Sequence, residues 1–155
     1  MSDKTNEEKL LYSYILNLDS VTDYGISLDS LLSEKSSIPE EGVRQDVHFK
    51  GTIEGHAFNG SISGTDYLLI KESGEFSLNI FATITTSDHK NISLQATGTA
   101  LPTDQPGRLS VSQTVSLLSN DQDYRWINSL SIRGEGHADM QKKQVIINAY
   151  YSPDK

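Results

Sequence analysis

Apolar and polar residues alternate with a period of two along most of this 155-residue chain. Successive side chains of a β-strand point to opposite faces, so this period predicts strands that each have one apolar face. Short breaks containing Gly, Ser, Asn and Asp separate the alternating segments at hairpin spacing and divide the chain into about eight to ten strands. The first segment is marked by Leu10, Tyr12, Tyr14, Leu16 and Leu18.

Strands of this kind have to bury their apolar faces together. Sequential strands joined by short turns favour a single antiparallel up-and-down (meander) β-barrel, because closure removes exposed strand edges. Four glycines suit the sharp bends that closure demands: Gly51, Gly55, Gly60 and Gly64. The opposite faces are rich in hydroxyl groups and are expected to face water; they include Ser77, Thr83, Ser93, Thr97, Ser112 and Thr114.

Only one segment departs from the strand pattern. Leu28, Leu31 and Leu32 have helical spacing, which predicts a short helix or lid segment near residues 27–34, with Asp23 or Ser27 as its N-cap. The charged residues 1–9 predict a flexible tail, and residues 10–155 a single barrel domain.

Composition narrows the possible functions. The chain has no cysteine, which excludes disulfides, a thiolate nucleophile and cysteine metal sites. Its net charge of −8 argues against nucleic-acid partners and against an anionic membrane surface. The first residues lack the apolar stretch of a secretory signal, so a cytoplasmic protein is expected.

Several short motifs occur in a fixed order. GTIEG, GTDY, ESG and QATG follow one another between Gly51 and Gly98, and YRWIN occupies Tyr124–Asn128. Their order and spacing resemble the signature of the bacterial and fungal family called domain of unknown function 3237. The resemblance covers roughly residues 10–151. It implies a small antiparallel meander barrel with a central cavity, and it implies no particular activity.

The chain departs from that family pattern at several positions. Tyr67 stands where the family has Trp, Gln95 and Thr97 replace an Arg-x-Arg pair, and Phe81-Ala82 replaces Arg-Tyr. If those arginines hold an anionic ligand in relatives, this chain lacks that clamp.

Polar residues that interrupt apolar faces are the first candidates for a site. Gln113 lies among Leu109, Val111, Val115 and Leu117, and Asn128 lies between Trp126 and Leu130. A buried amide needs hydrogen-bond partners. Either these amides pair within the protein, or they orient a ligand in an otherwise apolar cavity.

Aromatic and ionisable residues complete the candidate set. Tyr12, Tyr14 and Trp126 are either core residues or stacking surface for a ligand. Tyr67 and Asp66 are candidate polar contacts for that ligand. Asp66 either caps a turn or forms a general acid–base pair with Tyr67, and His56 is the alternative proton carrier, at a barrel mouth.

Metal binding is not expected. Glu135, His137 and Asp139 share one strand face, but that face is opposite Ile132 and is predicted to point to solvent.

Three functions remain open from the sequence. The first is a barrel that binds a small apolar or aromatic molecule. The second is a cyclase or isomerase that works in the cavity without a cofactor. The third is a structural or interaction module, such as a homodimer that pairs through a strand edge or through residues 28–32.

Overall fold

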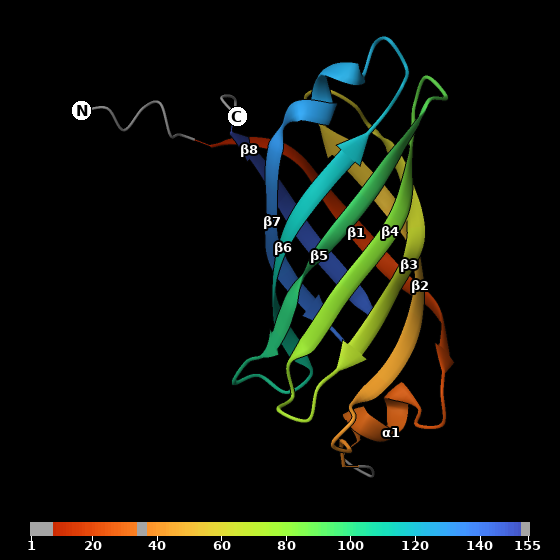
Figure 1. Ribbon diagram of the computed structural model, residues 1–155, viewed down its shortest axis with the longest axis vertical. Coiled ribbons are helices and arrows are strands. Elements are labelled where there is room, and N and C mark those ends of the chain that lie inside the picture. Colours follow the sequence, from red (N-terminus) through yellow and green to blue (C-terminus); the bar gives the residue numbers. More distant parts are fainter. Residues whose placement is uncertain (1–7, 34–36, 153–155) are drawn as a thin grey trace, which may run out of the picture.

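The computed structural model describes residues 8–33 and 37–152, and over this range the chain forms one closed barrel. Eight antiparallel strands pair in chain order, and β1 also pairs with β8 to complete the ring (Figure 1). The elements are β1 (Lys9–Asp23), α1 (Leu28–Leu32), β2 (Val43–Gly55), β3 (Gly60–Ile70), β4 (Phe76–Thr86), β5 (Asn91–Pro102), β6 (Arg108–Leu118), the 3-10 helix η2 (Arg125–Ser129), β7 (Ser131–Asp139) and β8 (Gln144–Ser152). The all-β meander barrel is therefore confirmed, with eight strands.

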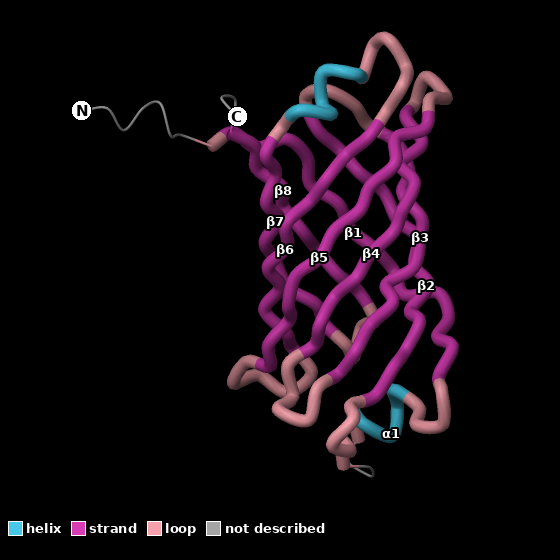
Figure 2. The backbone as a smooth tube through the Cα atoms, in the orientation of Figure 1, coloured by secondary structure: helices cyan, strands magenta, loops and turns pink. Residues whose placement is uncertain are grey.

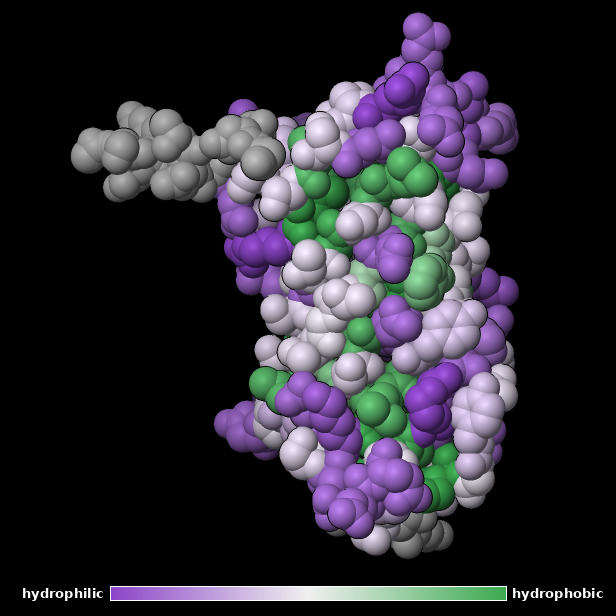
Figure 3. All heavy atoms as spheres, viewed as in Figure 1, coloured by the Kyte–Doolittle hydropathy of each residue, from purple (hydrophilic) through white to green (hydrophobic). Residues whose placement is uncertain are grey.

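The alternation separates an apolar interior from a hydroxyl-rich exterior. The buried residues form one hydrophobic cluster with contributions from all eight strands. Of the six Ser and Thr residues expected outside, five are exposed and Ser77 is half-buried. On the face seen in Figure 3, pale and purple side chains predominate, with green patches among them. Burial of the apolar rows on the inside is the main term that stabilises this ring.

Glycines allow the neighbouring backbones to come close where the ring bends. A Cβ on Gly51 would overlap the carbonyl oxygen of Ile15 on β1, and a Cβ on Gly60 would overlap that of Thr85 on β4. No side chain fits at these two positions. These two glycines thus allow close contact between adjacent strands of the barrel.

The two ends of the barrel differ, as the tube in Figure 2 shows. The upper end carries η2 and the β2–β3 and β4–β5 turns. It is closed by aromatic packing, because the ring of Phe58 lies 6.1 Å from Tyr12 and 6.2 Å from Tyr124. Ile127 of η2 is fully buried beside them.

The lower end carries α1 and three strand connections. The predicted short helix is confirmed, with Ser27 as its N-cap: the Ser27 hydroxyl accepts a hydrogen bond from the backbone N–H of Ser30 at 3.1 Å. Leu28 is buried, and Leu31 packs against the core. None of the helices in the described residues is long and apolar enough to cross a membrane.

Two expectations need correction. Residues 126–130 do not form a strand, because backbone bonds from Ile127 to Tyr124 and from Leu130 to Ile127 wind them into η2. The predicted tail, residues 1–9, lies mostly outside the described residues. Its last two residues are held by the barrel: Lys9 begins β1, and Glu8 forms an ion pair with Arg133 at 2.8 Å.

Replacement of Gly51 by Ala should destabilise the barrel by about 3 kcal/mol or more, because the added methyl group has to push β1 and β2 apart. Urea unfolding measures this difference. The neighbouring exposed Lys50→Ala variant is the control and should remain within ~0.5 kcal/mol of the parent. A loss below ~1 kcal/mol for Gly51→Ala would contradict the close approach of the two strands.

Candidate functional site

A cavity of about 70 Å³ lies inside the lower half of the barrel and is lined by all eight strands. It is here called the inner chamber. Since one water molecule occupies about 30 Å³ in the liquid, the chamber holds about two waters or one small functional group. Its lining is apolar except for three side chains that carry hydroxyl, carboxyl or amide groups: Tyr14, Asp66 and Gln113.

A wider pocket of about 430 Å³, here called the vestibule, lies at the lower end of the barrel. It is bounded by α1, the β3–β4 turn around Gly74, the connection at residues 102–108 and Met140. Phe76, Leu109 and Met140 line both spaces and so form the partition between them. A molecule that enters from the lower end therefore reaches the inner chamber past these three side chains.

Asp66 projects from β3 at an interruption of the β3–β4 ladder. Regular pairing runs to Asp66–Ile80 and resumes at Leu69–Ser77. In the gap, the backbone N–H of Asn79 donates to Asp66 Oδ1 at 3.0 Å, so the carboxylate replaces a backbone acceptor. The side chain thus belongs both to the wall and to the lining of the chamber.

The apolar surroundings change the acidity of this carboxyl group. Burial raises the pKa of Asp66 from 3.8 to about 6, against the smaller lowering effects of the Asn79 N–H and of the charge on Arg44. Arg44 lies on β2, where its guanidinium donates to the carbonyl oxygen of Leu68 at 2.8 Å. At pH 7 Asp66 is mainly ionised, with about one molecule in ten protonated.

Tyr14 and Gln113 face the same chamber from β1 and β6. Burial raises the pKa of Tyr14 to about 12; a side-chain hydrogen bond with Gln113 opposes this rise, and the charge of Asp66 adds to it. Gln113 packs against Gly134, where a Cβ would come within 3.1 Å of its side-chain oxygen. The structure thus brings together Tyr14, Asp66 and Gln113, three of the eight residues that the sequence indicated.

Tyr12 lies just outside this group. Its ring stacks on that of Tyr14 with centroids 5.9 Å apart, but it does not line the chamber, and its buried hydroxyl finds no hydrogen-bond partner among the residues that the structure describes. Tyr12 therefore belongs to the aromatic packing that closes the upper end. Its expected place in the ligand site is corrected to a place in the core.

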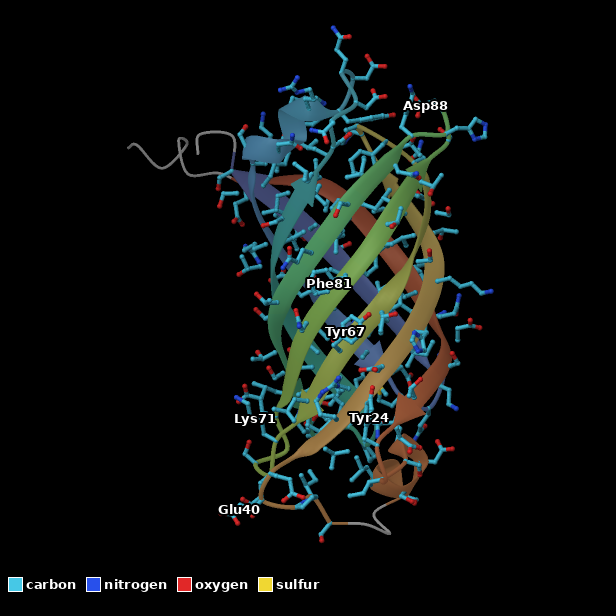
Figure 4. All side chains as sticks on the ribbon, turned by 45° about the vertical axis from the view of Figure 1, so that its right-hand side comes forward. Tyr24, Glu40, Tyr67, Lys71, Phe81 and Asp88 are labelled. Atoms are coloured by element: carbon cyan, nitrogen blue, oxygen red, sulfur yellow. The ribbon has the colours of Figure 1, made fainter. Side chains whose placement is uncertain are left out.

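Tyr67 points away from the interior. It follows Asp66 directly in a strand, so the two side chains face opposite sides of the wall. Tyr67 is 42% exposed and packs edge-on against the exposed Phe81, with ring centroids 6.1 Å apart (Figure 4). The expected Asp66–Tyr67 acid–base pair inside the cavity is therefore wrong.

The remaining candidates lie at the upper end, away from the chamber. Trp126 is 46% exposed on η2, and His56 is exposed in the β2–β3 turn. The Asn128 side chain accepts from the Ser119 N–H at 2.8 Å and donates to the Ser119 carbonyl oxygen at 2.9 Å. Asn128 thus fixes the connection after β6. Of the two roles that the sequence left open for this amide, pairing within the protein is the one observed.

Other residues of the site were missed. Phe76, Leu109 and Met140 separate the two spaces, and only their place at the lower strand ends could have indicated this role. Gln45 is a further buried amide on an apolar face, but it lines neither space: it donates to the carbonyl oxygen of Ile26 at 2.6 Å. Within residues 8–33 and 37–152, no group of three acidic or histidine side chains is placed to hold a metal ion.

The family model described as "Protein of unknown function (DUF3237)" matches residues 27–152. The chain belongs to the DUF3237 family. This confirms the family resemblance inferred from the GTIEG-to-YRWIN motifs. A search of curated proteins found no match.

Solved structures share the fold of this DUF3237 chain. A β-barrel-like protein from Acinetobacter baumannii is 20% identical, with 94% of each chain covered and a TM-score of 0.75. A protein of unknown function from Clostridium acetobutylicum is 16% identical, with 94% of this chain and 97% of that chain covered and a TM-score of 0.76. An enzyme from Penicillium herquei is 18% identical, with 94% of this chain and 93% of that chain covered and a TM-score of 0.62.

The departures from the DUF3237 motif concern mainly the outside of the barrel. Gln95 and Thr97, which stand at the Arg positions of the motif, are exposed, as is Phe81. These three substitutions therefore leave the lining of the inner chamber unchanged.

Replacement of Asp66 by Asn should raise stability at neutral pH, by about 2–3 kcal/mol, because it removes a buried charge and keeps an acceptor for the Asn79 N–H. The folded state binds the Asp66 proton more tightly than the unfolded state. The stability of the parent protein therefore falls as pH rises from 3.8 to about 6 and stays low above that range. The stability difference between variant and parent should shrink as pH falls through this range.

Urea unfolding at pH 7, 5.5 and 4.5 measures this difference. Asp46→Asn is the matched control with the opposite sign, because hydrogen bonds from Tyr24 and Arg44 lower the pKa of Asp46 and its charge is stabilising. An Asp66→Asn effect that is constant over this pH range would rule out a raised pKa at Asp66.

Proposed function

We propose that the protein binds one small, largely apolar molecule in the lower half of the barrel, with the single polar end of that molecule in the inner chamber. The observation that carries this proposal is the distribution of polar groups. In a lining drawn from all eight strands, the hydroxyl, carboxyl and amide groups are those of Tyr14, Asp66 and Gln113. An apolar pocket with a few converging polar groups is the usual form of a small-molecule site.

The sizes of the two spaces support a ligand whose polar end lies in the inner chamber and whose apolar body lies in the vestibule. The vestibule, at about 430 Å³, lies within the range of roughly 300–1,000 Å³ that is usual for ligand pockets. The inner chamber, at about 70 Å³, is about half the size of a cavity of about 150 Å³ that binds benzene, so it suits a functional group better than a whole ring. The body of the ligand would therefore occupy the vestibule and displace Met140, whose unbranched side chain adapts readily.

Filling the inner chamber should abolish binding. Ala138 is buried and lines the chamber, so Ala138→Leu adds three carbon atoms to that space. We expect it to weaken the binding of cyclohexanone and 1-naphthol about tenfold or more, as measured by ligand-observed NMR. His137→Leu, which makes a similar change at the adjacent residue outside the chamber, should bind both probes like the parent protein. Equal affinities in the two variants would place the site elsewhere.

A second candidate function is acid–base catalysis, as in an isomerase or a cyclase. It is favoured by one observation: a carboxyl group with a pKa of about 6 lies in the same apolar chamber as a phenol. A general base works best when its pKa is near the operating pH. An enzyme from Penicillium herquei shares the fold, which is consistent with catalysis in such a barrel.

Binding and catalysis differ in their response to Asp66→Asn. The amide has the shape of the carboxylate but cannot take up a proton, so under the catalytic hypothesis turnover should fall about 100-fold or more. Affinity should stay within about threefold of the parent. Parallel titrations and product assays on the same preparation measure the two quantities. A variant with full turnover would leave binding alone as the function.

A homodimer stays a prediction, but one route to it is closed. Each of the eight described strands pairs on both sides, so none of them offers a free edge to a second copy. The other route runs through α1, where Leu28 is already buried.

A further inference from the structure

Two acidic side chains, those of Asp66 and Tyr14, line the inner chamber, and at neutral pH they are in opposite protonation states. Burial raises the pKa of both, but Asp66 reaches about 6 and Tyr14 about 12. At neutral pH the carboxyl group is therefore mainly a base, and the phenol is a proton donor. A carboxylate and a phenol that line the same apolar chamber can serve as the base and the acid of a proton-transfer site.

The hydrogen bonds of Asp66 leave one oxygen available. The Asn79 N–H engages Oδ1 and fixes the carboxylate at the interruption of the β3–β4 ladder. Among the hydrogen bonds of the described residues, none is accepted by Oδ2. Asp66 thus combines a fixed position with a free acceptor, as a general base requires.

Tyr14 has the complementary arrangement. Tyr14 shares a side-chain hydrogen bond with Gln113, and this bond lowers the pKa of the phenol. An amide carries both a donor and an acceptor, so Gln113 can donate to the phenolic oxygen and leave the phenolic proton for a ligand. Because Gln113 is itself packed against Gly134 and is 5% exposed, it holds the phenol in place. The hydroxyl of Tyr14 can therefore serve a ligand oxygen inside the chamber.

The combination of a free base and a free donor selects among small polar groups. An anion would be repelled by the Asp66 carboxylate, and an ammonium ion would leave the Tyr14 donor without an acceptor. An alcohol satisfies both groups, as an acceptor from Tyr14 and as a donor to Asp66, but its O–H proton exchanges with water unaided and leaves a general base no step to accelerate. A carbonyl group uses both, through its oxygen and through the C–H bond next to it, and it fits a chamber of about 70 Å³.

Building on the function proposed above, we propose that the substrate is a small apolar ketone or enone whose carbonyl oxygen binds Tyr14 while Asp66 moves a proton at the neighbouring carbon. Asp66 Oδ2 takes the α-proton, and the electron pair of that C–H bond forms the C=C bond of an enolate. The carbonyl π pair moves to oxygen, where the Tyr14 hydroxyl stabilises it. Asp66 then returns the proton to the α-carbon, or to the γ-carbon of an enone, so the step needs no oxidant, reductant or cofactor.

Hydrogen–deuterium exchange of a simple ketone tests this inference. Cyclohexanone is incubated with the protein in D₂O near neutral pH, and loss of its α-proton signals is followed by proton NMR. We expect the protein to accelerate this loss above the buffer rate. Asp66→Asn and Tyr14→Phe should each reduce the acceleration about 100-fold.

Two control variants make the same chemical changes away from the chamber. Asp19→Asn alters an exposed carboxylate, and Tyr12→Phe removes the hydroxyl of the stacked tyrosine that lies outside the lining. Both should exchange the ketone at the parent rate.

Saturation-transfer NMR on the same samples measures binding of cyclohexanone, so the binding site and the proton transfer are tested separately. Bound ketone with accelerated exchange that depends on Asp66 and Tyr14 supports the inference. Bound ketone without acceleration, or with acceleration that survives Asp66→Asn, overturns the inference and leaves the binding site standing. Absence of bound ketone, with 1-naphthol also unbound, overturns the proposed function as well.

Discussion

Burial of one apolar face per strand is the constraint on which this molecule depends. Eight amphipathic strands cannot all hide that face in a flat sheet, whereas a ring places every apolar row inside and pairs every strand on both sides. Gly51 and Gly60 let the backbones of adjacent strands come into close contact. Aromatic side chains pack inside the upper end, and the inner chamber lies in the lower half.

The same burial sets the chemistry of the site. An apolar interior raises the pKa of any carboxyl group placed in it, and Asp66 is held there by a backbone N–H of the next strand. The charge costs stability at neutral pH, and it keeps a base in an apolar space. Stability given up at a reactive position is common in sites that perform proton transfer.

Much of this could be predicted from residue order alone. Period-two alternation placed Tyr14 and Gln113 inside, and the family motif indicated Asp66. Alternation also excludes Tyr67 from the interior, because adjacent residues of a strand point to opposite faces. The pairing of Tyr67 with Asp66 overlooked that constraint. Asn128 could not be placed, because backbone hydrogen bonds from Ile127 to Tyr124 and from Leu130 to Ile127 wind its strand-like surroundings into η2. Which half of the barrel stays open depends on contacts between separate connections, such as Phe58 with Tyr124, and alternation carries no signal for them.

The pairing of β1 with β8 also affects how the protein folds. These strands meet across a wide separation in sequence, as the hydrogen bond from Ser13 to Asn148 shows, with 135 positions between donor and acceptor. Hairpins such as β3–β4 need only local loop closure, so they can form early, whereas the ring cannot shut until both distant segments are available. During synthesis on the ribosome the nascent sheet therefore keeps two unpaired edges until β8 has emerged, and chaperone binding is most useful in that interval.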